Sequence, residues 1–144
     1  DFTGQTVAGA DTATAITFNT SAYSHNVSID GADASKIVFA RAGIYQLNFS
    51  AEITSTSAST VTFYFWPRIN GTDVANSTMV TTLHSNGDKK ITNRSGVFDV
   101  NAGDYLQSMF AVDSTSGSLS TTAATAFSPA SPSVTLSVAE LYVP

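Results

Sequence analysis

Several residue types that would point to particular protein classes are missing or scarce in this chain of 144 residues. Cysteine is absent, which excludes a disulfide framework and any metal site built on thiolates. Charged residues make up only 12%, and the six lysines and arginines form no basic stripe that would follow a phosphate backbone. No apolar run approaches the roughly 18 residues of a membrane span. We therefore expect a soluble domain that is held together by packing, binds no nucleic acid and inserts into no membrane.

Serine and threonine are abundant and account for 40 of the 144 residues, a bias toward uncharged strand-forming and turn-forming side chains. The most informative segment is 44–53, in which apolar and polar residues alternate. Its apolar positions are Tyr45, Leu47, Phe49, Ala51 and Ile53. A period of two predicts a long antiparallel strand with one buried face and one polar face.

Alternation and turn residues predict about ten strands and no helix of useful length. The other strands are predicted at 16–18, 27–29, 36–39, 60–70, 73–80, 89–100, 105–112, 119–127 and 133–143. Strand 60–70 is expected to pair with strand 44–53 through the hydroxyl-rich turn 54–59. Short strands at this spacing are typical of an all-β antiparallel sandwich or jelly roll. We expect that domain to span residues 16–144 and to follow an N-terminal arm or linker at residues 1–15.

Strand 60–70 carries large side chains on both faces. One face holds Val61, Phe63, Phe65 and Ile69, and the other holds Tyr64, Trp66 and Arg68. A sheet face covered only by solvent does not need two large aromatic side chains such as Tyr64 and Trp66 side by side. The second face is therefore predicted to pack against another molecule. Stacking of these aromatic rings on a sugar is the alternative use. Because aromatic residues often anchor oligomer contacts, the interface interpretation is favoured.

Four motifs follow one another along the chain. They are Gly43-Ile-Tyr45, Arg68-Ile-Asn-Gly71, Phe98-Asp-Val-Asn-Ala-Gly-Asp104 and an apolar closing strand. Their order, over roughly residues 14–143, resembles the jelly roll of complement globular-head and tumour necrosis factor-like domains, most closely those on bacteriophage fibre tips and capsids. The resemblance implies a homotrimer. The sheet that holds the chain's end, the aromatic strand and the strand after Gly103-Asp104 would surround the threefold axis. The residues placed at that axis are Tyr64, Trp66, Arg68, Tyr105, Gln107 and Met109.

Residues suited to catalysis are few. The only glutamates, Glu52 and Glu140, could form a glycosidase pair, but such a pair needs a separation of roughly 5 to 9 Å across a cleft, and the pattern implies no cleft. His25 and His84 lie in loop-like contexts without the spacing of a metal site or a nucleophile pair. We therefore predict a protein that is not an enzyme, with no catalytic residues and no cofactor.

Oxygen-bearing side chains lie on either side of the predicted strand 27–29. Asp30, Asp33 and Asn26 could bind calcium, since hard cations prefer carboxylate and carbonyl oxygens. Capping of local backbone groups is the simpler interpretation, because aspartate and asparagine favour turns. No acidic cluster for an axial calcium is evident, so no metal site is predicted.

The predicted function is that of a non-enzymatic virion-surface structural protein of a bacteriophage. Its trimers would decorate the capsid as head fibres or form the host-attachment tip of a tail fibre. In decoration, residues 1–15 would hold other virion proteins; at a tip, the loops 54–59, 84–88 and 113–118 would touch a host glycan or protein. A secreted recognition module of the same superfamily that binds a carbohydrate or a protein is the alternative.

Overall fold

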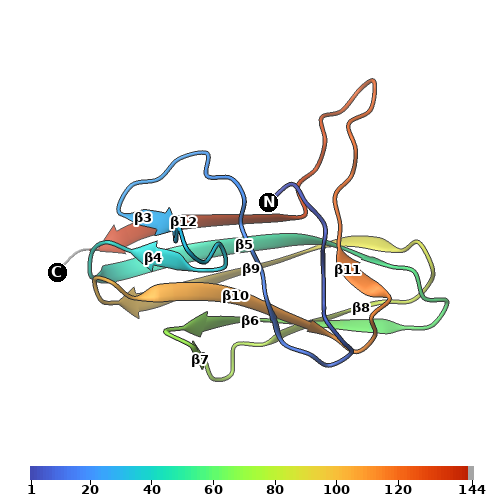
Figure 1. The fold of residues 1–144 in the computed structure, drawn as a ribbon, viewed down its shortest axis with the longest axis horizontal. Helices are drawn as coiled ribbons and strands as arrows, with labels where there is room; N and C mark the ends of the chain where they lie inside the picture. The colour runs from blue at the N-terminus through green and yellow to red at the C-terminus, as the bar shows by residue number, and fades with distance from the viewer. Residues whose placement is uncertain (143–144) are drawn as a thin grey trace.

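The structure is a computed structural model that describes residues 1–142, and it consists of two antiparallel sheets with no helix among these residues (Figure 1). One sheet, here the first sheet, contains β1 (Gln5–Thr6), β5 (Gly43–Ser55), β9 (Lys89–Val100), β11 (Gly117–Leu119) and β12 (Val134–Tyr142). The second sheet contains β2 (Thr14–Ala15), β3 (Val27–Ile29), β4 (Ile37–Phe39), β6 (Val61–Ile69), β7 (Thr72–Asp73), β8 (Met79–Leu83) and β10 (Tyr105–Val112). The predicted all-β antiparallel architecture is confirmed. Residues 1–142 hold no helix long and apolar enough to cross a membrane.

β5 is the central strand of the first sheet. It pairs with β9 along one side and with β12 and β11 along the other. The alternation predicted for 44–53 is confirmed, because Tyr45, Leu47, Ala51 and Ile53 are buried and Phe49 is half-buried, packed against the core. The strand therefore presents its apolar face to the interior and its polar face outward.

The predicted pairing of segment 60–70 with β5 is wrong. β6 lies in the second sheet, where it pairs with β10 and β8. The residues between β5 and β6 carry the chain from one sheet to the other, and the apolar faces of the two strands meet across the core. The rings of Phe49 and Phe65 lie 5.6 Å apart, centroid to centroid. Alternation shows that each strand has a buried face, but two apolar faces can meet across a sandwich as well as lie beside each other in one sheet.

Three other strand predictions are also corrected. Segment 16–18 is not a strand, although Ile16 and Phe18 are buried. Segment 73–80 is divided between β7 and β8, because residues 74–78 leave the sheet in a turn at which Asn76 has a positive φ angle of 56°. Segment 119–127 is a loop from residue 120 onward.

The predicted strands 27–29, 89–100 and 105–112 coincide with β3, β9 and β10, and predicted strand 36–39 contains β4. The closing strand, predicted at 133–143, is β12. Residues 143–144 lie outside the described part of the chain.

The segment predicted as an N-terminal arm lies along the sandwich (Figure 1). Its strands β1 and β2 pair with β11 and β10, so the segment touches both sheets. Val7 is buried in the core, and the amino group of Asp1 donates a hydrogen bond of 2.6 Å to the carbonyl oxygen of Val134. The domain boundary at residue 15 stays a prediction, but residues 1–15 are held by packing and hydrogen bonds.

The core consists of two clusters. The larger contains Phe63, Phe65 and Phe110, and the smaller is built around Phe39 and Tyr45, whose ring centroids are 4.9 Å apart. β12 joins the two clusters, because Leu136 and Val138 pack against both. The sandwich is therefore stabilised mainly by aromatic and aliphatic burial.

Gly117 gives a test of the packing around the larger cluster. A Cβ atom at this position would lie 2.5 Å from Cγ1 of Val112 and 2.8 Å from Cζ of Phe63, both of which are buried. We expect Gly117→Ala to lower the free energy of unfolding by about 2 kcal/mol, because the core must shift to admit the methyl group. Urea unfolding followed by circular dichroism measures the change. Gly31→Ala, where nothing lies within 4 Å, is the control, and equal stability of both variants would contradict the packing described here.

Candidate functional site

The structure brings the six predicted axis residues together on the outer face of β6 and β10. In the register of these strands Arg68 lies opposite Gln107, and Trp66 lies opposite Met109. Tyr64 is two residues before Trp66 on the same face, and Tyr105 is two residues before Gln107. We call the face formed by Tyr64, Trp66, Arg68, Tyr105, Gln107 and Met109 the aromatic face.

Polar groups of the aromatic face have partners within the chain. Asp73 accepts hydrogen bonds of 2.7 Å from both Nε of Arg68 and Nε1 of Trp66, and the bond from Arg68, followed by that from Trp66, holds the pKa of Asp73 below its usual value. Gln107 donates a hydrogen bond of 2.7 Å to Oγ of Ser35. Met109 is only 3% exposed in the single chain. The role of this face in a trimer stays a prediction.

The sheet that the resemblance implies at the threefold axis is not present as a single sheet. The closing strand β12 pairs with β5 in the first sheet, whereas β6 and β10 belong to the second sheet. The chain's end and the aromatic face therefore lie on opposite outer surfaces of the sandwich. The inward side chains of β12, those of Val134, Leu136 and Val138, pack into the interior from the first sheet.

An apolar patch that the sequence pattern did not reveal lies at one end of the outer face of the first sheet. It consists of Ile44, Val97, Ala139 and Tyr142, here called the terminal patch. Ile44 lies opposite Tyr142, while Val97 and Ala139 flank the same residue of β5, Gln46. Val97 and Tyr142 are each 59% exposed. One signal of this patch was present in the sequence. Among the outward positions of β5 from residue 44 to residue 52, only Ile44 is apolar.

A polar hollow occupies the middle of the same face. The outward side chains of its wall come from β5, β9 and β12, and they are Asn48, Ser50, Asn93, Ser95, Thr135 and Ser137. These side chains are amides and hydroxyls, which both donate and accept hydrogen bonds and carry no charge. The hollow is therefore suited to an uncharged polar ligand or to a partner surface of the same kind.

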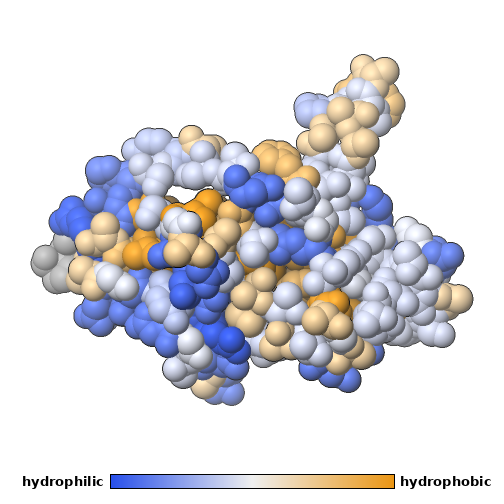
Figure 2. Space-filling view, in the orientation of Figure 1, coloured by the Kyte–Doolittle hydropathy of each residue, from blue (hydrophilic) through white to orange (hydrophobic). Residues whose placement is uncertain are grey.

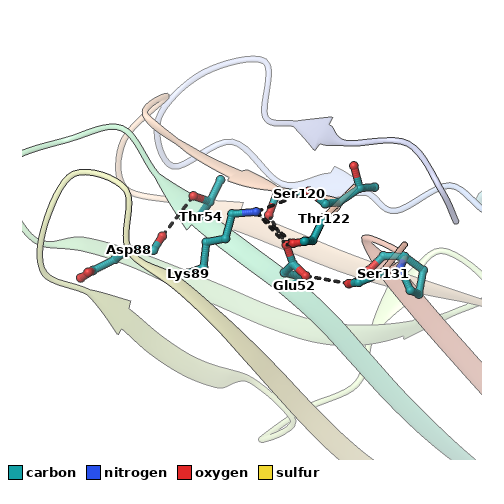
Figure 3. Close-up of polar contacts among 9 residues, drawn as sticks. Glu52, Thr54, Asp88, Lys89, Ser120, Thr122 and Ser131 are labelled. Atoms are coloured by element: carbon teal, nitrogen blue, oxygen red, sulfur yellow. Dashed lines mark hydrogen bonds and ion pairs between the residues drawn. The ribbon is translucent and has the colours of Figure 1, made fainter. Parts of the chain in front are cut away.

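Glu52 forms the densest polar network of the outer face (Figure 3). Its Oε1 accepts hydrogen bonds from Ser120 at 3.0 Å, Thr122 at 2.8 Å and Nζ of Lys89 at 3.1 Å. Its Oε2 accepts a hydrogen bond of 2.7 Å from Ser131. The side chain is only 8% exposed, because the loop 120–133 covers it. Glu52 thus ties both ends of that loop to β5.

The environment of Glu52 determines its protonation. Burial alone would raise the pKa of the carboxyl group, but hydrogen bonds from Ser131, Thr122, Lys89 and Ser120 outweigh burial and lower the pKa from 4.5 to about 2. A general acid needs a raised pKa, so this carboxylate is suited to holding the loop and not to donating a proton.

The structure does not bring the two glutamates together. Glu140 lies opposite Tyr45, seven positions from Glu52 along β5, which corresponds to roughly 23 Å of strand. A glycosidase pair needs a separation of roughly 5 to 9 Å. Residues Glu52 and Glu140 therefore cannot act as such a pair in this conformation.

The low pKa of Glu52 predicts a loss of stability in acid. The folded-state pKa of about 2 lies below the unfolded value of 4.5, so the stabilisation is complete above pH 4.5 and is lost as the pH falls toward 2. Urea midpoints measured between pH 7 and pH 2 should fall in this window, and Glu52→Gln should remove part of the fall. Asp33, Asp73, Asp88 and Asp104, whose pKa values are also lowered, would titrate in both proteins. An identical pH dependence for Glu52→Gln would contradict the network.

The loop 120–133 projects from the sandwich as a narrow finger (Figures 1 and 2). One isolated bridge, between Thr122 and Ser131, joins its two sides near the base. Phe127 near the tip is 91% exposed. We call residues 120–133 the finger. Its apolar tip is held away from the domain by the Glu52 network at its base.

The three predicted recognition loops lie together at one end of the sandwich. The backbone amide of Ser55 donates a hydrogen bond of 3.2 Å to the carbonyl of Asp88, and that of Thr56 donates one of 3.0 Å to the carbonyl of Ser116. These bonds link loops 54–59, 84–88 and 113–118. Whether the loops touch a host ligand stays a prediction.

Two of the candidate calcium residues, Asp30 and Asp33, perform turn chemistry in the structure, while the side chain of Asn26 donates a hydrogen bond of 3.4 Å to Glu140. Oδ1 of Asp30 accepts hydrogen bonds from the backbone amides of Ala32 and Asp33, and Asp33 binds Ser35 and forms an ion pair of 3.3 Å with Lys36. Within residues 1–142 no group of three or more histidine or acidic side chains is placed to hold a metal ion.

No protein-family model and no curated protein matches this chain. The inference of function therefore depends on the surfaces described above and on the order of motifs in the sequence.

Proposed function

We propose that this chain is a non-enzymatic structural protein of a virion surface, in which three jelly-roll domains associate around an axis. The observation that carries the assembly is the terminal patch. Its apolar side chains lie on the outer face of the sheet that holds the end of the chain, where a single copy leaves them in water. Exposed apolar patches on an otherwise polar sheet face favour contact with another protein surface.

The strand order supports the jelly-roll part of the proposal. Strands β12, β5 and β9 are neighbours in one sheet, and β4, β10, β6 and β8 follow one another in the other. The chain crosses from sheet to sheet between β4 and β5, β5 and β6, β8 and β9, and β9 and β10. Repeated crossing with antiparallel neighbours distant in sequence is typical of Greek-key jelly rolls.

The terminal patch is favoured over the aromatic face as the contact between copies. On the aromatic face, Trp66 and Arg68 already share Asp73, and Met109 is already buried. Val97 and Tyr142 of the terminal patch are each 59% exposed, so their burial gains more from association. The six residues of the aromatic face remain the alternative interface.

The placement on a virion is supported by the resemblance of the ordered motifs to phage fibre and capsid domains. Residues 1–15 are held on the sandwich by β1, β2 and Val7, so they do not form a free arm that reaches out to other virion proteins. We therefore favour a contact through other segments, in which the finger and the loops 54–59, 84–88 and 113–118 touch the particle or the host. Phe127 at the tip supplies an exposed apolar anchor for such a contact.

Localisation on particles tests this proposal. Antibody to the chain, with gold label, should bind intact phage particles in electron micrographs, on the shell for a decoration protein or at a fibre end for an attachment tip. Label confined to secreted material that contains no particles would contradict the proposal and favour the secreted recognition module.

The polar hollow favours one alternative function, that of a carbohydrate-binding module. Its uncharged amides and hydroxyls suit the hydroxyl groups of a sugar. Binding on a glycan array that is abolished by Asn48→Ala and Asn93→Ala would support this alternative. A trimer built on the first sheet would cover the hollow, so glycan binding there by a protein shown to be trimeric would argue against the assembly proposed above.

A further inference from the structure

A mostly apolar cavity lies between the two sheets, at the edge where β9 faces β6 and β8. Its empty space is about 460 Å³, counting the part open to solvent. Phe49, Phe65 and Met79 of its wall belong to the larger core cluster, and Phe98 belongs to the smaller one. The cavity therefore lies between the two clusters.

One small residue explains why this part of the core is unfilled. It is not Gly96, which lies opposite Leu47 on the inward side of β9, because the Phe98 ring lies 2.8 Å from where a Cβ atom of Gly96 would be. Ser108 takes an inward position on β10 between Leu106 and Phe110, where a large apolar residue would fill the space. As a result Phe49 and Phe98 stay half-exposed although they face the interior. Protein cores rarely leave such a space, because the lining atoms lose their packing contacts.

Arg94 lies at the mouth of the cavity and is the only charged residue of its wall. It is opposite Phe49 in the β-ladder, is exposed, and donates a hydrogen bond to the carbonyl oxygen of Ser77. In the described part of the chain the ion pairs are formed by Lys36, Arg68 and Lys89, and Arg94 takes part in none of them. A cationic group with several free donors thus borders an apolar space.

We propose that this cavity binds a small amphiphile with one apolar chain and an anionic head, such as a medium-chain fatty acid. The apolar chain would cover the half-exposed rings of Phe49 and Phe98, and the carboxylate would accept hydrogen bonds from the guanidinium group of Arg94. Apolar walls with one well-placed polar group are typical of small-molecule sites. Arginine is suited to carboxylates because its planar donors match the two oxygens.

Titration calorimetry of the full chain with decanoate, below its critical micelle concentration, tests the proposal. We expect one decanoate per chain, bound at least about tenfold more tightly than decyltrimethylammonium, which has the same tail and the opposite charge. Arg94→Gln should weaken decanoate binding by about tenfold and leave decanol unaffected, because only the charge-assisted bond is lost. Arg41→Gln, an exposed arginine away from the cavity, is the matched control and should bind decanoate normally.

Filling the cavity provides the second variant. Ser108→Leu should abolish binding of both decanoate and decanol in a protein that circular dichroism shows to be folded. If that variant does not fold, the methyl resonance of Met79 in the unaltered chain should shift on addition of decanoate, because Met79 lines the cavity. No binding of decanoate, equal binding of the cationic amphiphile, or full affinity in Arg94→Gln would overturn the proposal. A folded Ser108→Leu protein that binds decanoate normally would also overturn the proposal. A Ser108→Leu protein whose only change is a loss of self-association would overturn it too, because that result would assign the cavity to a second copy of the chain.

Discussion

Replacing Glu52 with alanine is expected to lower the free energy of unfolding by about 3 kcal/mol, because a nearly buried carboxylate with four partners is removed. The substitution leaves the ammonium group of Lys89 without its carboxylate and three hydroxyls, those of Ser120, Thr122 and Ser131, without their acceptor. These three hydroxyls lie at the base of the finger. The finger should therefore become mobile before the sandwich itself unfolds.

Urea unfolding at neutral pH measures the change in stability, and limited chymotryptic cleavage near Phe127 measures the change in the finger. Gln46→Ala is a matched control, since Gln46 lies on the same outer face of β5 and makes only one long side-chain hydrogen bond, 3.4 Å to Ser95. We expect the control to unfold like the unaltered chain. A Glu52→Ala protein with unchanged stability and unchanged cleavage would show that the network does not hold the finger.

Replacing Val97 with aspartate is expected to convert the proposed trimer into monomers. Val97 is 59% exposed in the single chain, so the substitution leaves the fold intact. Around a threefold axis it would place three carboxylates in a desolvated contact, where like charges without partners cost far more than they do in water. The molar mass by light scattering should fall from that of three copies to that of one.

Val80→Asp is the control for this experiment and separates the two candidate interfaces. Val80 is 55% exposed and lies opposite Tyr64, at the margin of the aromatic face. Val80→Asp should leave the trimer intact if copies meet through the terminal patch. The reverse result, a monomeric Val80→Asp protein and a trimeric Val97→Asp protein, would assign the interface to the aromatic face.

The strands could be predicted from sequence where alternation was long and regular. β5 and β10 have many residues with a period of two, and the Asn70-Gly71 turn has the positive φ angles that its sequence indicates. Pairing could not be predicted in the same way. Alternation fixes which face of β6 is buried, but whether β6 lies beside β5 or across the core from it depends on contacts between distant parts of the chain.

The surface features could likewise be predicted from sequence only where their residues lie on one strand. Half of the aromatic face could be identified from β6 alone, because Tyr64, Trp66 and Arg68 alternate along that strand. The terminal patch could not, since Ile44, Val97 and Tyr142 come from three strands that only the fold brings together. The finger was predicted in part as a strand, and the structure instead holds this loop by side-chain bonds to Glu52, which lies 68 positions or more away in sequence.

The molar mass of the unaltered chain in solution tests the central claim most directly. Sedimentation equilibrium at micromolar concentration should give the mass of three copies of the 15.0 kDa chain. A folded protein that sediments as a single 15.0 kDa species over this concentration range would contradict the proposed assembly and the virion role that depends on it.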